Sequence, residues 1–413
     1  MPTALEEKRA ALRKFILGTI GDTLKQADGF LKHPYISPGG PYAVQLWDWD
    51  SYWTIYAILN LARQTGDAAL LEKARPHARG TLLNFLDQQG EDGAIPICMA
   101  PNCADIFDCR SSADFNMAKP FLGQMAWMLH ENRVMTDDEL RTCLPKLKKY
   151  HDCAIKRYQD SRTGLFFWAH DWAIGVDDDP AAWGRPAKSA ATLYQNVFLY
   201  QDMLDASKLA KALGDEVCEM EYADHCHALK TALQKYCWDQ REKSFFSVDL
   251  QCNANRTKNA VGWTLNIGLD AFWFCLPLKV LTWNSILPFW AGLGTQEQFD
   301  AFVRENLVPG RLWSNHGIRS LSQDEPMYRP EEKRGNPSNW LGPIWLIANY
   351  ITWQALLRYE RSDLADQLAA NLIDMLYNDL QTNGKFHEYY SPESGLGVHN
   401  PGFMSWNALA ALL

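Results

Sequence analysis

Two acidic residues far apart in the chain, Asp177 and Glu388, each lie in a segment rich in side chains that bind polar ligands. Asp177 belongs to residues 170–180, which also contain histidine, tryptophan and further aspartates, and Glu388 stands between His387 and Tyr389. A pair of carboxyl groups can perform acid–base catalysis, in which one donates a proton and the other activates water. We therefore take Asp177 as a candidate general acid and Glu388 as a candidate general base.

The surroundings of Asp177 suit the role of an acid. Asp178 and Asp179 follow it directly, and neighbouring like charges raise the pKa of a carboxyl group. We expect Asp178 and Asp179 themselves to cap the turn before Pro180. Hydrolysis of a glycosidic bond with inversion needs two carboxyl groups about 6.5–9.5 Å apart, so that a water molecule fits between them.

Aromatic and amide side chains accompany the two carboxyl groups. The chain has 17 tryptophans, many of them next to acidic or amide residues. Aromatic faces stack on the apolar faces of a sugar, while fixed carboxylates and amides hydrogen-bond to its hydroxyl groups. The candidate substrate-binding residues are Trp47, Asp48, Trp49, Asp50, Trp183, Gln195, Asn196, His316, Arg319, Trp340, Trp345, Tyr389 and Trp406.

Two groups among these candidates have more specific expected roles. Trp49, Asp50 and Asn196 are expected to bind the sugar whose bond is cleaved. Arg319 is expected on the side of the leaving group, where its guanidinium could hold a carboxylate, such as that of a glycerate, in two parallel hydrogen bonds. The alternative for Arg319 is pairing with an acidic residue just downstream, Asp324 or Glu325, so that it only holds its own loop.

A repeated loop pattern indicates how the chain brings these residues together. A glycine that ends a helix and begins a short strand-like stub occurs at Gly93, Gly164, Gly310 and Gly384. One interval is twice as long as the others, and residues 243–247 fill it with a serine in the place of the glycine. With the loop at residues 38–40, this makes six loops of one repeat.

The segments between the loops alternate in character. Residues 51–62, 120–129, 192–204, 340–357 and 403–413 are apolar nearly all round, which is typical of buried helices. Residues 139–150 and 363–377 have a single apolar stripe, which is typical of outer helices. Gly-Asp turns at 66–67 and 214–215 join neighbouring helices. The sequence predicts an all-α (α/α)6 toroid of six inner and six outer helices, with short β stubs in the loops, as a single domain over residues 1–413.

Composition narrows the range of functions. The net charge of −9 disfavours a nucleic-acid partner, and no apolar run approaches the roughly 20 residues that a membrane span needs. The chain opens without a signal-peptide pattern, and its ten scattered cysteines are expected to be reduced thiols of a cytoplasmic protein. No phosphate loop, dinucleotide motif or metal-binding cluster is visible, so neither a cofactor nor a metal is expected. The oligomeric state stays open.

Five motifs, in this order, resemble segments of clan G glycoside hydrolases, the group of trehalases and family 63 α-glycosidases. Residues 38–53 are similar to the first trehalase signature, and residues 175–180 to the segment of bacterial family 63 enzymes that contains the general acid. Residues 317–322 and 339–345 are similar to segments on the leaving-group side. Residues 388–395 resemble the motif that contains the general base.

The resemblance implies an inverting hydrolase of a small α-linked glucoside or mannoside. Pro41 and Leu341 stand where these families have arginine, and the second trehalase signature is absent, so the chain looks most like bacterial glucosylglycerate and mannosylglycerate hydrolases. A trehalase or another α-glucosidase of neutral disaccharides is an alternative. Two other classes also stay open: a terpene-cyclase-like enzyme with a magnesium motif at residues 177–179, and a sugar-binding toroid without activity.

Overall fold

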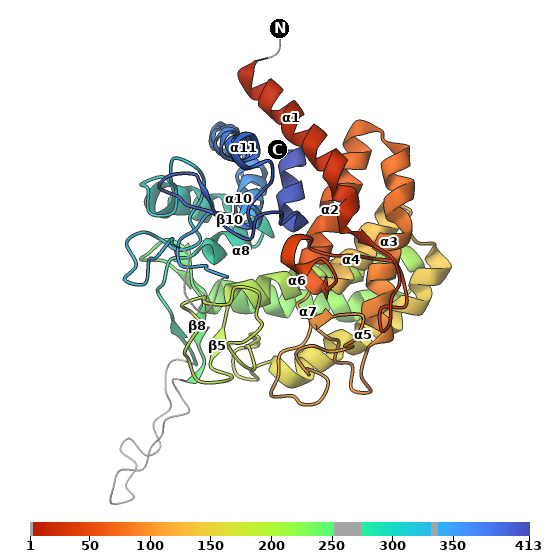
Figure 1. The fold of residues 1–413 in the computed structure, drawn as a ribbon. Helices are drawn as coiled ribbons and strands as arrows, with labels where there is room; N and C mark the ends of the chain where they lie inside the picture. The colour runs from red at the N-terminus through yellow and green to blue at the C-terminus, as the bar shows by residue number, and fades with distance from the viewer. Residues whose placement is uncertain (1–2, 252–273, 332–337) are drawn as a thin grey trace, which may run out of the picture.

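The computed structural model describes residues 3–251, 274–331 and 338–413. Within these ranges, helices of an inner ring and helices of an outer ring alternate along the chain (Figure 1). The inner elements are α2 (Asp48–Thr65), α4 (Leu122–Glu131), α6 (Leu193–Leu213), the 3-10 helix η4 (Trp283–Ile286) continued by α8 (Leu287–Trp290), α10 (Leu346–Arg358) and the 3-10 helix η6 (Ser405–Leu412).

The outer ring pairs with the inner one. Its elements are α1 (Ala4–Thr19), α3 (Ala68–Asp87), α5 (Asp137–Tyr158), α7 (Glu216–Tyr236), α9 (Gln296–Phe302) with the π-helical turn η5 (Val303–Leu307), and α11 (Ser362–Asn383). Each inner helix contacts the next, and η6 contacts both α10 and α2, which closes the ring. The first helix, α1, packs beside α11 and η6 (Figure 1), so the two ends of the chain meet. The predicted (α/α)6 toroid is confirmed.

Short antiparallel strands join the loops of the repeat, as predicted. The pairs are β1 (Leu24–Lys25) with β2 (Tyr35–Ile36), β3 (Leu46–Trp47) with β4 (Cys98–Met99), β6 (Trp238–Asp239) with β7 (Ser244–Phe245), β10 (Tyr389–Tyr390) with β11 (Gly397–His399), and the three-stranded set β5 (Ala190–Ala191), β8 (Val248–Asp249) and β9 (Leu276–Pro277). Because β3 pairs with β4, the first and second loops are held together at the N-terminal end of α2.

The predicted turns between helices are confirmed, with one correction. Gly66 and Gly214 end their helices in the left-handed conformation, and the aspartates that follow them cap α3 and α7. The four repeat glycines also have positive φ. In the fifth stub, however, the left-handed residue is Lys243 at a φ of 52°, one position before the serine that was expected there.

One helix of the inner ring begins later than predicted, and one inner element was not predicted. The helix predicted for residues 340–357 begins only at Leu346, because Pro343 disfavours a helical conformation in the residue before it and Gly342 has a φ of 130°. Ile344 instead forms β-bridges with Arg319 and Tyr390. The fourth inner element, η4 with α8, was not predicted, since it is only two turns long.

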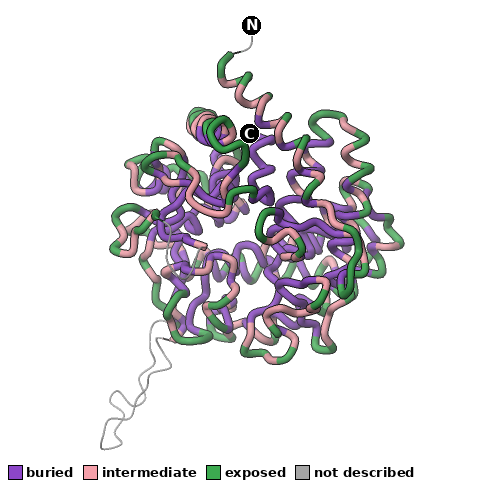
Figure 2. Tube along the Cα trace, in the orientation of Figure 1, coloured by how far each residue is buried: buried purple, intermediate pink, exposed green. Residues whose placement is uncertain are grey.

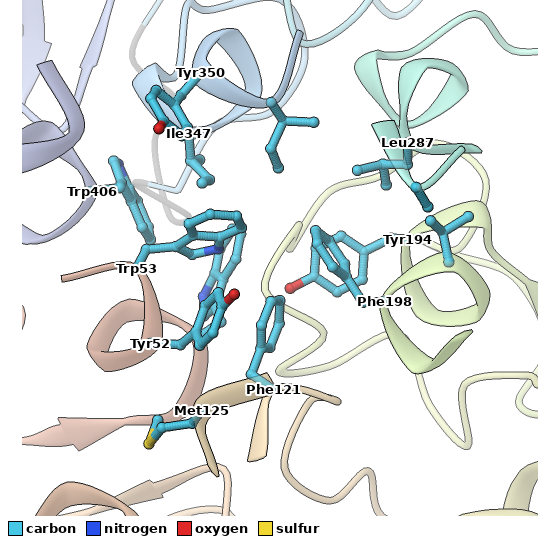
Figure 3. Packing of buried hydrophobic residues seen from close by; sticks show 14 of the residues in the cluster. Tyr52, Trp53, Phe121, Met125, Tyr194, Phe198, Leu287, Ile347, Tyr350 and Trp406 are labelled. Atoms are coloured by element: carbon cyan, nitrogen blue, oxygen red, sulfur yellow. The ribbon is translucent and has the colours of Figure 1, made fainter. Parts of the chain in front are cut away.

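Aromatic side chains fill the centre of the toroid. The buried residues form a continuous inner layer (Figure 2), and Figure 3 shows Tyr52, Trp53, Phe121, Tyr194 and Phe198 meeting there. The ring centroid of Phe121 lies 5.1 Å from that of Tyr52 and 4.7 Å from that of Phe198. Such contacts add to the stabilisation from burial. The centre is therefore a packed plug rather than a channel.

Two further findings concern membrane-spanning helices and the cysteines. Among the described residues, no helix is long and apolar enough to cross a membrane. The cysteines in the described ranges are free thiols, most of them buried. Cys252 lies outside the described residues.

Buried asparagines connect the stubs to the inner helices. Asn349 on α10 accepts a hydrogen bond from the Ile318 amide at 2.6 Å and donates to the Ile318 carbonyl at 3.0 Å and the Trp345 carbonyl at 2.9 Å. Asn196 on α6 makes the same two-way contact with Phe166, both bonds measuring 2.7 Å. Each amide thus replaces the strand partner that an isolated stub lacks.

We expect Asn349→Ala to lower the free energy of unfolding by about 2–4 kcal/mol, because two buried backbone groups of Ile318 lose their partner. Chemical denaturation measures the change. Asn378→Ala, at an exposed position of α11, is the matched control and should change stability by less than about 0.5 kcal/mol. Equal stability of the two variants would contradict a fold-supporting role for Asn349.

Candidate active site

One mouth of the inner ring opens into a cavity of about 490 Å³, within the size range of small-molecule sites. Residues from the first, third, fifth and sixth loops meet in it, as the repeat predicts. The predicted site residues that line it are Trp47, Trp49, Asp50, Asp177, Trp183, Trp345, Glu388 and Trp406.

Both candidate catalytic carboxyl groups face this cavity in surroundings that favour protonation. Burial raises the pKa of Glu388 to about 7, and the nearby charge of Asp177 contributes to the rise. Burial also raises the pKa of Asp177, against a hydrogen bond from Ser338 and the charge of Lys119. The charge of Asp177 therefore acts on Glu388 within the same cavity.

Burial, rather than the neighbouring aspartates, is the main reason for the raised pKa of Asp177; Asp178 contributes less. Asp178 accepts a hydrogen bond from the Trp340 amide at 2.7 Å and so ties the third loop to the fifth. Asp179 caps the following turn, as predicted, by accepting from the Ala181 amide at 2.9 Å. Of the three aspartates, only Asp177 lines the cavity, so they do not form the magnesium motif of a terpene-cyclase-like site.

Glu388 is held in place by Asn400, which was not among the expected site residues. The Asn400 side-chain amide donates to the Glu388 carboxylate and lies 3.3 Å from the Tyr42 hydroxyl. Asn400 has a φ of 45°, a left-handed conformation that asparagine tolerates better than most residues. The hydrogen bond favours the ionised carboxylate, which opposes the effect of burial.

A buried ion pair forms the support beneath the cavity. The Lys119 ammonium lies 2.7 Å from the Asp48 carboxylate, and their side chains are 1% and 0% exposed. The same carboxylate accepts from the backbone amides of Lys119 and Trp49, both at 2.7 Å. Asp48 was expected to bind substrate, but it is fully used in these contacts. Lys119 itself reaches the cavity, where burial raises the pKa of Asp50 and the charge of Lys119 opposes this rise.

Aromatic rings form the inner wall of the cavity. Trp345 stacks on Trp340 with a centroid distance of 4.0 Å and nearly parallel planes, and Trp49 lies 4.9 Å from Trp406. Trp340 was expected to touch the substrate, but it stands behind Trp345 and lies outside the cavity lining.

A second aromatic series forms the outer rim. Edge contacts link Tyr42 to Trp47, Trp47 to Phe107, and Phe107 to Trp172 at 6.1, 5.5 and 5.1 Å. Trp172 and Trp183 are 52% and 46% exposed. Rings that are open to solvent at a cavity mouth can stack on a sugar ring that enters.

Arg319 does not reach the cavity. Its guanidinium donates to the carbonyls of Trp313 at 2.7 Å and Gly310 at 3.2 Å, and to the Tyr328 hydroxyl at 3.1 Å. Its acidic neighbour is Glu393, at 3.8 Å, rather than Asp324 or Glu325. The side chain therefore holds its own loop. It is not placed to bind a carboxylate of the leaving group, as was expected.

The other expected site residues that lie outside the cavity lining contact other parts of the protein instead. The amide of Asn196 is fully used by Phe166 and Thr192, so its expected contact with the sugar is replaced by a contact with the stub. Tyr389 is buried between Trp345 and His399. Gln195 is buried on α6, and His316 lies against Gly395. Asn336, in the fifth loop of the repeat, lies outside the described residues.

The cavity also contains residues that the sequence did not identify: Tyr42, Phe107, Lys119, His170, Asp171, Trp172, Ala173, Gly175 and Ser338. The segment around Asp177 could have indicated several of them, because it is adjacent in sequence. Phe107 carries no signal, since it lies in a loop without a motif. Gly175 is needed for space: a Cβ there would meet the Lys119 side chain and the Tyr194 hydroxyl at 3.1 Å, at a φ of 89°.

An (α/α)6 toroid with two carboxyl groups in one aromatic cavity has the architecture of a glycoside hydrolase. A family model, the mannosylglycerate hydrolase MGH1-like glycoside hydrolase domain, matches residues 43–406. The chain belongs to this family and is a glycoside hydrolase.

Individual proteins show the same relationship. The chain is 25% identical over 308 residues to a mannosylglycerate hydrolase of Thermus thermophilus, covering 66% of this chain and 69% of that protein. A probable mannosyl-oligosaccharide glucosidase of Schizosaccharomyces pombe is 24% identical over 80% of this chain and 38% of its own length.

Solved structures share the fold. The crystal structure of the family 63 mannosylglycerate hydrolase from Thermus thermophilus in complex with glucose matches 98% of both chains, with a TM-score of 0.68 and 21% identity. The neutral trehalase of Saccharomyces cerevisiae matches 92% of this chain and 73% of its own, with a TM-score of 0.63 and 17% identity.

We expect Lys119→Met to lower the free energy of unfolding by about 3–5 kcal/mol, because it leaves the Asp48 charge buried and unpaired. In the double variant Lys119→Met with Asp48→Asn, no charge is left unpaired, so part of this loss should be recovered. Denaturant unfolding of both variants measures the difference. A double variant that is less stable than Lys119→Met would contradict the ion pair as the source of the effect.

Proposed function

We propose that this glycoside hydrolase acts with inversion on a small α-linked mannoside or glucoside, such as mannosylglycerate or glucosylglycerate. The observation that carries the proposal is that Asp177 and Glu388 line one cavity, where the charge of Asp177 helps to raise the pKa of Glu388. The names of relatives support the substrate class, since mannosylglycerate hydrolases of Thermus thermophilus and Selaginella moellendorffii are among them. We further propose that residues 1–413 act as one catalytic unit in the cytoplasm, where free thiols persist.

Each carboxyl group has one task in this mechanism. Protonated Asp177 donates its proton to the glycosidic oxygen as the bond to the leaving group breaks. Ionised Glu388, held by Asn400, takes a proton from the water that attacks the anomeric carbon from the opposite face. The product has the inverted configuration, with Asp177 ionised and Glu388 protonated. Exchange of protons with solvent restores the starting state.

The sugar at the site of cleavage is bound by the floor and wall of the cavity. Asp50 is 6% exposed and presents its carboxyl group there as an acceptor for sugar hydroxyl groups. Trp49 and Trp406 supply the adjoining ring faces. Burial raises the pKa of Asp50, while the charge of Lys119 lowers it and so supports the acceptor form.

The recognition of the leaving group favours a second candidate substrate. Among the described residues of the cavity, the basic side chains are Lys119, which is paired with Asp48, and His170, which lies 3.0 Å from Asp171. The rim is otherwise dominated by aromatic rings. Rings stack on a neutral sugar as readily as on any acceptor, so an α-linked disaccharide is the second candidate.

The assignment of the two carboxyl groups is tested with Asp177→Asn and Glu388→Gln on a panel of mannosylglycerate, glucosylglycerate, trehalose and α-linked glucobioses. Each variant should reduce the release of monosaccharide by about 10²–10⁴-fold, the usual cost of losing one acid or base. Asp366→Asn and Glu297→Gln, on exposed faces of α11 and α9, are the matched controls. Near wild-type turnover of either cavity variant would disprove its assignment.

The stereochemistry is tested by proton NMR during the first minutes of hydrolysis of an α-linked substrate. Inversion releases the β-anomer first, before mutarotation mixes the two forms. Initial release of the α-anomer would mean a retaining enzyme, which needs carboxyl groups only about 5–5.5 Å apart.

The role of Asn400 predicts a shift in the pH profile. Glu388 must be ionised, so kcat/KM of the wild type should fall as the pH drops through its pKa of about 7. Asn400→Ala removes a donor that stabilises the carboxylate, raises this pKa, and should move the acidic limb to higher pH by about one unit. Asn378→Ala is the control. An unmoved or downward-shifted limb would show that Glu388 is not the group that sets it.

A further inference from the structure

The opposite mouth of the inner ring holds a second cavity, of about 740 Å³. It is built from residues along α2, α4 and α6, the end of α8, and the C-terminal half of α10. No residue lines both this cavity and the candidate active site, and the mechanism above uses none of its residues. We call it the distal cavity.

Aromatic rings supply much of the distal lining. Tyr56, Trp127, Trp290 and Trp353 are only partly buried there, so their faces stay accessible, and Trp53 lies deeper. The toroid thus repeats at its second mouth the kind of surface that stacks on sugar rings at the first.

Polar side chains in fixed positions lie between the rings. Gln354 accepts from the Trp290 indole at 2.8 Å and donates to the Tyr56 hydroxyl at 2.9 Å. Asp205 is 8% exposed and pairs with Lys208 at 2.7 Å. Planar amides and a carboxylate that cannot rotate freely are suited to the directional hydrogen bonds of hydroxyl groups.

Two buried polar atoms of the lining residues have no hydrogen-bond partner within residues 3–251, 274–331 and 338–413. They are the indole nitrogen of Trp53 and the side-chain oxygen of Gln124, whose residues are each 1% exposed. Gln124 is fixed by its own donors: its side-chain amide bonds to the Pro120 carbonyl at 2.7 Å and its backbone amide to Asp202 at 2.8 Å. A buried donor and a buried acceptor without partners are costly.

The charges around the distal cavity favour a neutral ligand. Arg63, Lys208 and Arg358 line it, but Asp205 and Glu131 lie among them. The inner helices present their C-terminal ends at this mouth, and the partial negative charge of these ends disfavours anions. A ligand with many hydroxyl groups and no charge fits this lining best.

We infer that the distal cavity is a second carbohydrate-binding site, for a neutral sugar of one or two rings. It is separate from the catalytic cavity but near it: Phe121 packs on Tyr52 of the distal lining at 5.1 Å and on Trp49 of the catalytic lining at 6.5 Å. The inference does not depend on the proposed reaction, since none of its residues takes part in it.

The test is isothermal titration of the whole protein, carrying Glu388→Gln to prevent turnover, with D-mannose, D-glucose and trehalose as probes. At least one probe should bind at two sites. Asp50→Ala should remove one of them, and Trp353→Ala should weaken the other on the order of tenfold, the effect of losing an aromatic stacking contact and its buried area. Trp238→Ala, on the β6–β7 hairpin outside both cavities, is the matched control.

The outcomes separate this inference from the proposed function. Binding that survives Asp50→Ala but weakens with Trp353→Ala supports the distal site even if no substrate is found for the catalytic one. Gln201→Ala, a smaller change at a partly buried position of the distal lining, gives the same readout if Trp353→Ala fails to fold. A single site for all three probes that Asp50→Ala removes, or binding unchanged in both distal variants, would overturn the inference.

Discussion

The buried ion pair between Lys119 and Asp48 is the contact on which the rest of the site depends. It joins the second loop to the first turn of α2, and the Asp48 carboxylate also accepts from two backbone amides. Removing two charges from water is costly, and geometry of this quality is what compensates for it. The residues placed by this pair include Asp50, two positions along α2, and Gly175, whose missing side chain leaves room for Lys119. The charge of Lys119 then acts on the pKa values of Asp50 and Asp177.

The same principle, a polar contact that fixes a loop to the inner ring, recurs around the toroid. Besides Asn196 and Asn349, Asn407 on η6 donates to the His387 carbonyl at 2.7 Å and to the Phe403 carbonyl at 2.9 Å. His387 precedes Glu388, so the last inner helix holds the segment of the candidate base. Inner helices that are packed on all sides by apolar neighbours provide rigid positions for these asparagines. The loops can therefore hold reactive groups with little freedom, although their strands are only two or three residues long.

Much of the architecture could be predicted because it rests on patterns that are local in sequence. Helices that are apolar all round must be inner, and a repeat of six loops places the third and sixth across the ring. The partners of polar side chains are not local. The sequence around Asn196 does not show whether its amide binds a sugar or the backbone of Phe166. The sequence around Arg319 likewise does not show whether its guanidinium binds a ligand or backbone carbonyl groups. The pairing of Asp48 with Lys119 joins residues that no motif connects. The sequence thus could not predict which polar side chains contact a ligand and which contact other groups of the protein.

Bound substrate can decide which of the two carboxyl groups, Asp177 or Glu388, holds the proton. With one proton on the two carboxyl groups there are two forms, and only the form with Asp177 protonated and Glu388 ionised can react in the proposed mechanism. Asn400 favours this form, because it donates to Glu388. Ser338 and Lys119 favour the other, because they lower the pKa of Asp177. A bound substrate differs between the two forms: its glycosidic oxygen accepts a hydrogen bond only from protonated Asp177, and the attacking water donates only to ionised Glu388. In the proposed mechanism, substrate binding then selects the reactive form.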